Sequence, residues 1–162
     1  MKDKKMSLFL FITYLLLLTW VIVYKMDLSI LYGRYESGSL NLIPLAGKAV
    51  YNGILNYQKI LFNIISFIPF GMYMEMLFRK ASWVTNLGII LLVSLVFEVW
   101  QFVFLLGIAD ITDLLANGFG GAIGINIMYV LTSIWRDKAY SRVNILCLSA
   151  TVFVILITYL TL

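Results

Sequence analysis

The sequence predicts an all-α fold: a polytopic membrane bundle of about five transmembrane helices with a long extracellular first loop. Of the 162 residues, 62% are hydrophobic and only 12% are charged, which is about half the charged fraction of a typical soluble domain. The mean hydropathy is +0.97. The apolar residues form runs long enough to cross a bilayer, and basic residues gather at the ends of those runs.

The apolar runs define the expected spans. The first covers about residues 6–24, and no small-residue cleavage site follows it, so we expect a retained helix rather than a signal peptide. The others are expected at about residues 60–78, 82–106, 112–135 and 143–162. No internal repeat divides the chain, and residues 1–162 are expected to form a single membrane domain.

A polar segment of about residues 25–59 joins the first two expected spans, and it is too long for a simple connector. It contains Arg34 and the run from Asn41 to Pro44, in which the proline excludes a continuous helix. Near its end, tyrosines and lysines alternate with apolar residues. This mixture predicts a helix lying in the membrane interface over about residues 48–59.

The basic residues predict the orientation in the membrane. One side of the expected bundle holds eight of them and the other holds four, and the richer side is expected to be cytoplasmic. The inner residues are Lys2, Lys4, Lys5, Arg79, Lys80, Arg136, Lys138 and Arg142, and the outer ones are Lys25, Arg34, Lys48 and Lys59. We therefore expect a protein of the cell membrane with a cytoplasmic N-terminus. Five spans would place the C-terminus outside.

Composition also excludes several classes of function. The chain has no histidine, which rules out histidine acid–base catalysis and histidine-ligated metal sites. Its single cysteine, Cys147, cannot form a disulfide framework. The net charge of +4 arises from basic residues that flank membrane spans, so no nucleic-acid partner is expected. No cofactor is expected either.

Polar residues inside the apolar stretch 94–124 form the candidate site. Placing a carboxylate inside the bilayer costs at least ~2.5 kcal/mol of free energy, so such residues are expected to have a structural or functional role. Glu98 and Gln101 share one helical face. In the next helix, five positions share a common stripe within an arc of about 80° at roughly 100° per residue: Asp110, Asp113, Asn117, Gly121 and Gly124. We expect the glycines to let a neighbouring backbone approach closely.

Antiparallel helices joined by a tight turn would bring these polar groups to one level near the outer surface, together with Asn63. Glu98 has no basic residue in its own span, so it must be protonated, paired across helices or facing a wet cavity. We expect it close to Asp113, accompanied by a metal ion, Arg34 or a shared proton. Asp110 is also expected to cap its helix. The amides of Asn63, Gln101 and Asn117 could instead serve as hydrogen bonds between helices.

Four motifs resemble the VanZ-like family, named for an accessory protein of glycopeptide-resistance clusters. The matching pieces are Arg34 with Asn41-Leu42-Ile43-Pro44, Asn63 with Phe67-Ile68-Pro69-Phe70-Gly71, Ser94 with Glu98 and Gln101, and Asp110-x-x-Asp113 with Asn117. They span about residues 30–130. Many members carry an arginine just before the first aspartate, which is absent here. The resemblance implies lower sensitivity to teicoplanin.

The candidate binding residues are therefore Arg34, Asn41, Asn63, Glu98, Gln101, Asp110, Asp113 and Asn117. The favoured hypothesis is a protein that acts without catalysis at the outer leaflet. Its ligand would be a membrane lipid or lipid-linked cell-wall precursor, a lipoglycopeptide or a partner protein. The alternative is an enzyme that modifies a phospholipid head group, with Glu98, Asp110 and Asp113 holding Mg²⁺ or acting as acid and base. Phosphate sites usually include clustered Lys or Arg, and the sequence places none beside these carboxylates. A transporter is disfavoured because five spans lack an inverted repeat.

Overall fold

The computed structural model describes residues 2–23, 39–45, 50–51, 54–55, 57–106 and 108–161. Within them lie five long helices. These are α1 (Lys2–Val23), α2 (Tyr57–Leu77), α3 (Trp83–Val103), α4 (Ile111–Trp135) and α5 (Ala139–Thr161), with a short 3-10 turn, η3 (Arg136–Lys138), before the last. In the described part of the chain, α1 to α4 are long and apolar enough to cross a membrane. The predicted all-α membrane bundle is confirmed, whereas five spans and an extracellular first loop remain predictions.

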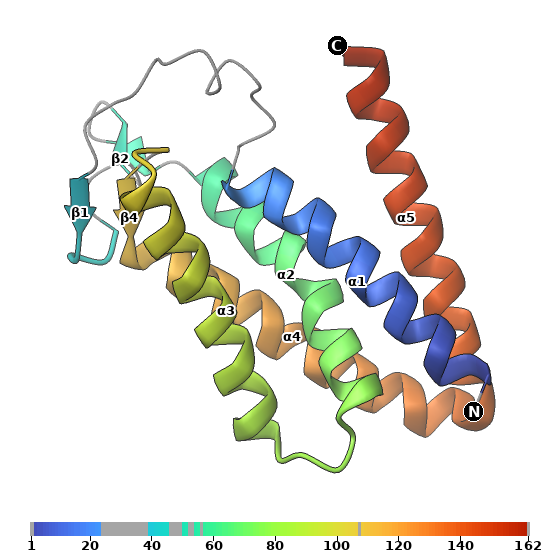
Figure 1. Cartoon of the computed structure of the whole chain (residues 1–162). Coiled ribbons are helices and arrows are strands. Elements are labelled where there is room, and N and C mark those ends of the chain that lie inside the picture. Colours follow the sequence, from blue (N-terminus) through green and yellow to red (C-terminus); the bar gives the residue numbers. More distant parts are fainter. Residues whose placement is uncertain are drawn as a thin grey trace.

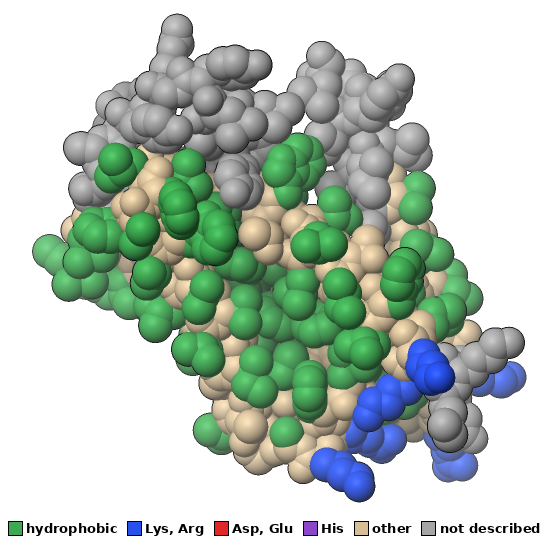
Figure 2. Space-filling model, in the orientation of Figure 1, with side chains coloured by type: hydrophobic (Ala, Val, Ile, Leu, Met, Phe, Trp, Pro, Cys, Tyr) green, Lys and Arg blue, Asp and Glu red, His purple; other side chains and the backbone are tan. Residues whose placement is uncertain are grey.

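The helices run between two chemically different ends of the molecule (Figure 1). The N-terminus, the turn between α2 and α3 and the junction of α4 with α5 lie at one end, and the short strands lie at the other. Figure 2 shows lysine and arginine side chains gathered at the first of these. We call it the basic end. Its described cations are Lys4, Lys5, Arg79, Lys80, Arg136, Lys138 and Arg142. The opposite end, which carries β1 and β4, is the strand end.

Four short strands lie in segments that were not expected to form them. β1 (Ser39–Asn41) pairs in parallel with β4 (Ile108–Asp110), so the first loop and the α3–α4 connection lie side by side. The connection is therefore more than the expected tight turn. β2 (Val50–Tyr51) pairs antiparallel with β3 (Ile54–Leu55).

The β2–β3 pair shows that the interfacial helix predicted over residues 48–59 is wrong. The strands Val50–Tyr51 and Ile54–Leu55 lie on either side of Asn52-Gly53 in the sequence, and Asn-Gly is the strongest short sequence signal for a hairpin. The regular helix α2 begins only at Tyr57.

α4 packs most closely on α2, and glycines allow this approach. A Cβ atom on Gly71 would collide with the backbone carbonyl of Gly121, and one on Gly124 would collide with the carbonyl of Ile68. Gly120 faces the carbonyl of Ile64 in the same way. The prediction that the glycine stripe admits a neighbouring backbone is confirmed. Small residues at such crossings are a general means of packing membrane helices, because they allow backbones to come into contact.

α1 covers α2 through aromatic side chains. The ring of Phe11 lies 5.4 Å from that of Phe70 and 5.5 Å from that of Tyr73, measured between centroids. The Tyr14 hydroxyl donates a hydrogen bond to the carbonyl of Ser66. These contacts pack α1 against the side of α2 opposite to α4, along the middle and second half of that helix.

Candidate functional site

The first turns of α2 and α4 meet at the strand end in an ion pair. Lys59 Nζ lies 2.7 Å from Asp113 Oδ2 and 4.0 Å from Asp110 Oδ2. The side chains of Lys59 and Asp113 are 22% and 10% exposed, whereas that of Asp110 is fully buried. The ion pair is therefore the accessible part of the site, with Asp110 beneath it.

Asp110 is the centre of the hydrogen-bond network around this pair. Its Oδ1 accepts from the backbone N–H of Thr112 at 2.9 Å, which makes it the N-cap of α4, as predicted. The same oxygen accepts from Asn41 Nδ2 at 3.0 Å. Asn41 and Asp110 are also paired in register between β1 and β4. One aspartate thus connects the first loop to the start of α4.

Glu98 approaches the network from α3. Its Oε2 accepts from the backbone N–H of Asp110 at 2.9 Å, and the residue is 5% exposed. This hydrogen bond joins α3 to β4, and the three alternatives for Glu98, namely protonated, paired across helices or facing a wet cavity, stay predictions. The cation seen beside the carboxylates is Lys59, while Arg34 lies outside the described residues.

The segment from Asn41 to Leu45 closes over the start of α4. The backbone N–H of Leu45 donates to Thr112 Oγ1 at 3.0 Å, and that of Ile43 donates to Asn41 Oδ1 at 3.3 Å. Leu45 has φ of 60°, a conformation that few non-glycine residues adopt. Leu42 and Ile43 are 67% and 68% exposed, so apolar side chains project beside the polar site.

Three of the predicted site residues take no part in the ion pair: Gln101, Asn117 and Asn63. Gln101 Nε2 donates to the carbonyl of Ile22 at 2.6 Å and so satisfies an acceptor in the last turn of α1. Asn117 Nδ2 donates to Ser94 Oγ at 2.9 Å, which joins α4 to α3. Asn63 is buried on α2, one turn beyond Lys59. These geometries fit hydrogen bonding between helices, the alternative considered for Gln101 and Asn117.

Lys59 and Thr112 are the residues that sequence reasoning missed. The expectation that no basic residue accompanies the carboxylates is wrong for Lys59. The available signal was its spacing from Asn63, because residues four apart share a helical face. No group of three Asp, Glu or Cys side chains within the described ranges is arranged to hold a metal ion.

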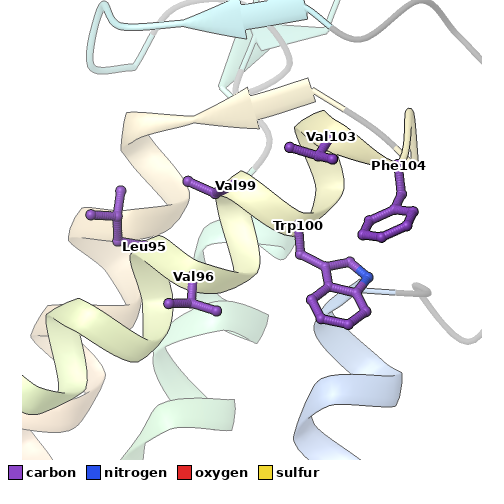
Figure 3. A pocket seen from close by; sticks show the side chains of 6 residues that line it. All are labelled: Leu95, Val96, Val99, Trp100, Val103 and Phe104. Atoms are coloured by element: carbon purple, nitrogen blue, oxygen red, sulfur yellow. The ribbon is translucent and has the colours of Figure 1, made fainter.

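An apolar groove of about 270 Å³ lies along α3 (Figure 3). Its lining residues are Leu95, Val96, Val99, Trp100, Val103 and Phe104. The rings of Trp100 and Phe104 lie 5.0 Å apart between centroids. Aromatic residues at this level are typical of membrane interfaces. Because its lining is wholly apolar, the groove is not a second polar site.

A family model described as VanZ/LLP1 matches residues 11–135 of the chain. The chain belongs to the VanZ family. It is 31% identical over 159 residues to Protein VanZ of Enterococcus faecium, in an alignment that covers 98% of this chain and 94% of that protein. No solved structure gives a significant match. The resemblance inferred from four motifs is thereby confirmed.

The VanZ match contains the whole candidate site. All eight candidate binding residues, Arg34 included, lie within residues 11–135, as do Lys59 and Thr112. Only η3 and α5 follow the matched region. Membership of this VanZ family, together with four membrane-length helices, identifies a multi-pass membrane protein.

Proposed function

We propose that this VanZ-family protein lowers the sensitivity of the cell to teicoplanin-like lipoglycopeptides. It acts without catalysis at the outer leaflet, on a lipid-linked cell-wall precursor, the drug or a partner. The observation that carries this proposal is the accessible Lys59–Asp113 ion pair above buried Asp110 and Glu98. Such a pair offers a positive charge and hydrogen-bond acceptors to the head group of an amphiphile.

The surroundings of the ion pair favour an amphiphilic ligand. Exposed Leu42 and Ile43 stand directly after Asn41, whose side chain binds Asp110. A molecule with a polar head and an apolar tail would fit both surfaces. Its head would form hydrogen bonds with the ion pair, and its tail would cover the exposed apolar side chains. Cell-wall lipid precursors and lipoglycopeptides share this chemistry.

The proposed orientation is testable by labelling. In a Cys147→Ser background, a cysteine introduced for Pro44 is expected to react with an impermeant maleimide in intact cells. Cysteines introduced for Lys80 and Lys138, at the basic end, are expected to react only after the membrane is permeabilised. Labelling at position 80 in intact cells would overturn the outer-leaflet argument.

The function itself is tested by expression in a sensitive Gram-positive host. The inhibitory concentration of teicoplanin is expected to rise more than that of vancomycin. The Glu98→Gln variant is expected to reach the membrane at normal abundance, because its amide oxygen still accepts from the Asp110 N–H, but to lose the resistance. A fully active Glu98→Gln protein would refute a role for the carboxylate charge. No change in the wild-type inhibitory concentration, despite membrane expression, would refute the function.

A second candidate function has one observation in its favour. Lys59 supplies the cation that a phosphate-binding site needs, which the sequence had not placed near the carboxylates. An enzyme acting on a phospholipid head group could then use Glu98 as acid or base. Release of a modified head group from labelled lipid vesicles by the purified protein would establish this alternative.

A further inference from the structure

Five basic side chains lie together where the start of α1 meets the junction of α4 and α5. They are Lys4, Lys5, Arg136, Lys138 and Arg142, all of them exposed. Figure 1 places the N-terminus beside this junction, and Figure 2 shows the gathered cationic side chains at the same end. We call these five residues the basic corner. They lie at the end of the molecule opposite to the Lys59 site.

The local structure forces these charges together. α4 ends at Trp135 and α5 begins at Ala139, so η3 leaves only three residues for the change of direction. Arg136 turns the chain with φ of 47°. Asn144 Nδ2 donates to Ser7 Oγ at 2.9 Å, which holds the first turns of α5 and α1 side by side. Lys4 lies three residues before Ser7, so this buried contact places it near the α4–α5 junction.

The charges in the basic corner are not neutralised by carboxylates in the described structure. Among the side chains that the structure describes, which exclude those of Asp3 and Asp137, no carboxylate forms an ion pair with any of the five. The segments 2–5 and 136–142 contain six basic and two acidic residues, a net charge of +4. The Arg142 guanidinium lies 5.0 Å from the centre of the Trp135 ring, which orients it beside an aromatic residue of the membrane interface.

We propose that the basic corner binds the phosphate head group of an anionic phospholipid. Basic pockets between membrane helices recognise such head groups, and arginine binds phosphate oxygens with two parallel hydrogen bonds. Apolar surface for the acyl chains lies next to the charges, because Phe9 on α1 is 69% exposed and Ile145 on α5 is 62% exposed. Free phosphate could bind the basic side chains but would not contact the apolar surface. The inference depends on neither the resistance function nor the ligand of the Lys59 site.

The test measures thermal unfolding of the purified full chain in a neutral detergent. Phosphatidylglycerol is expected to raise the midpoint in a saturable manner. Phosphatidylcholine, which carries no net charge, is expected to have a much smaller effect, and inorganic phosphate at equal concentration is expected to have almost none. Equal stabilisation by phosphatidylcholine would overturn the proposal, and so would full stabilisation by inorganic phosphate.

A matched pair of variants locates the site. Arg136→Gln with Arg142→Gln is expected to raise the phosphatidylglycerol concentration needed for half of the shift by roughly tenfold or more. Arg79→Gln with Lys80→Gln removes the same charge from the α2–α3 turn at the same end and is expected to leave that concentration nearly unchanged. An equal loss in both variants would mean diffuse charge attraction and would refute a defined corner. If the arginine variant does not fold, Lys138→Gln against Lys80→Gln makes the same comparison.

Discussion

Replacing Gly71 with alanine is expected to prevent the protein from accumulating as a folded bundle. A single methyl group there would collide with the backbone carbonyl of Gly121, and backbone cannot turn aside as a side chain does. α2 and α4 would have to separate, which would also pull Lys59 away from Asp113. We expect destabilisation of about 3 kcal/mol or more, at the upper end of the range for overpacked cores. Membrane abundance and the thermal unfolding midpoint measure it.

Gly88 provides the control for this substitution. It lies in α3 with nothing within 4 Å of the position that a Cβ atom would take. Gly88→Ala is therefore expected to be neutral or slightly stabilising, since alanine favours helix by about 1 kcal/mol over glycine. A Gly71→Ala protein as stable as Gly88→Ala would contradict the close packing of α2 on α4.

Replacing Lys59 with methionine is expected to destabilise the strand end and abolish resistance. Methionine keeps most of the side-chain volume but leaves Asp113 and buried Asp110 without the ammonium group that now lies between them. Removing one partner of a buried ion pair costs about 3 kcal/mol or more, and the partial exposure of Lys59 places the effect at the low end. Thermal unfolding and the inhibitory concentration of teicoplanin measure the two losses.

A second substitution separates charge from packing at this site. Adding Asp113→Asn to Lys59→Met also removes the carboxylate that Lys59 contacts, so the double variant is expected to recover part of the lost stability but none of the resistance. Lys80→Met, in the exposed α2–α3 turn, serves as the control and is expected to be silent. Strictly additive losses in the double variant would show that the two side chains do not interact.

Much of this architecture follows from local patterns in the sequence. The four membrane-length helices follow from apolar runs, and the close approach of a neighbouring backbone to α4 follows from the spacing of Gly121 and Gly124. The cap of α4 by Asp110 follows from residue type and position. Each of these depends on residues within one helix, whose periodicity is visible in the sequence.

The parts that sequence reasoning missed depend on contacts between distant segments. Lys59 was assigned to a polar loop, and only the packing of α2 on α4 brings it to Asp113. The partner of Gln101 is a carbonyl on α1, which no spacing in the sequence indicates. The β1–β4 pair is three residues long on each side, too short for alternation to be visible.

The contact between Asn41 and Asp110 spans 69 residues of chain, and that between Leu45 and Thr112 spans 67. During synthesis Asn41 and Leu45 are therefore made well before Asp110 and Thr112, which they contact at the strand end. Their pairing must wait until α2 and α3 have been inserted and the start of α4 has emerged, since contacts of such separation form only after the intervening chain is ordered. The binding site is completed late in biogenesis, and a chain that stops before α4 would carry membrane helices but no site.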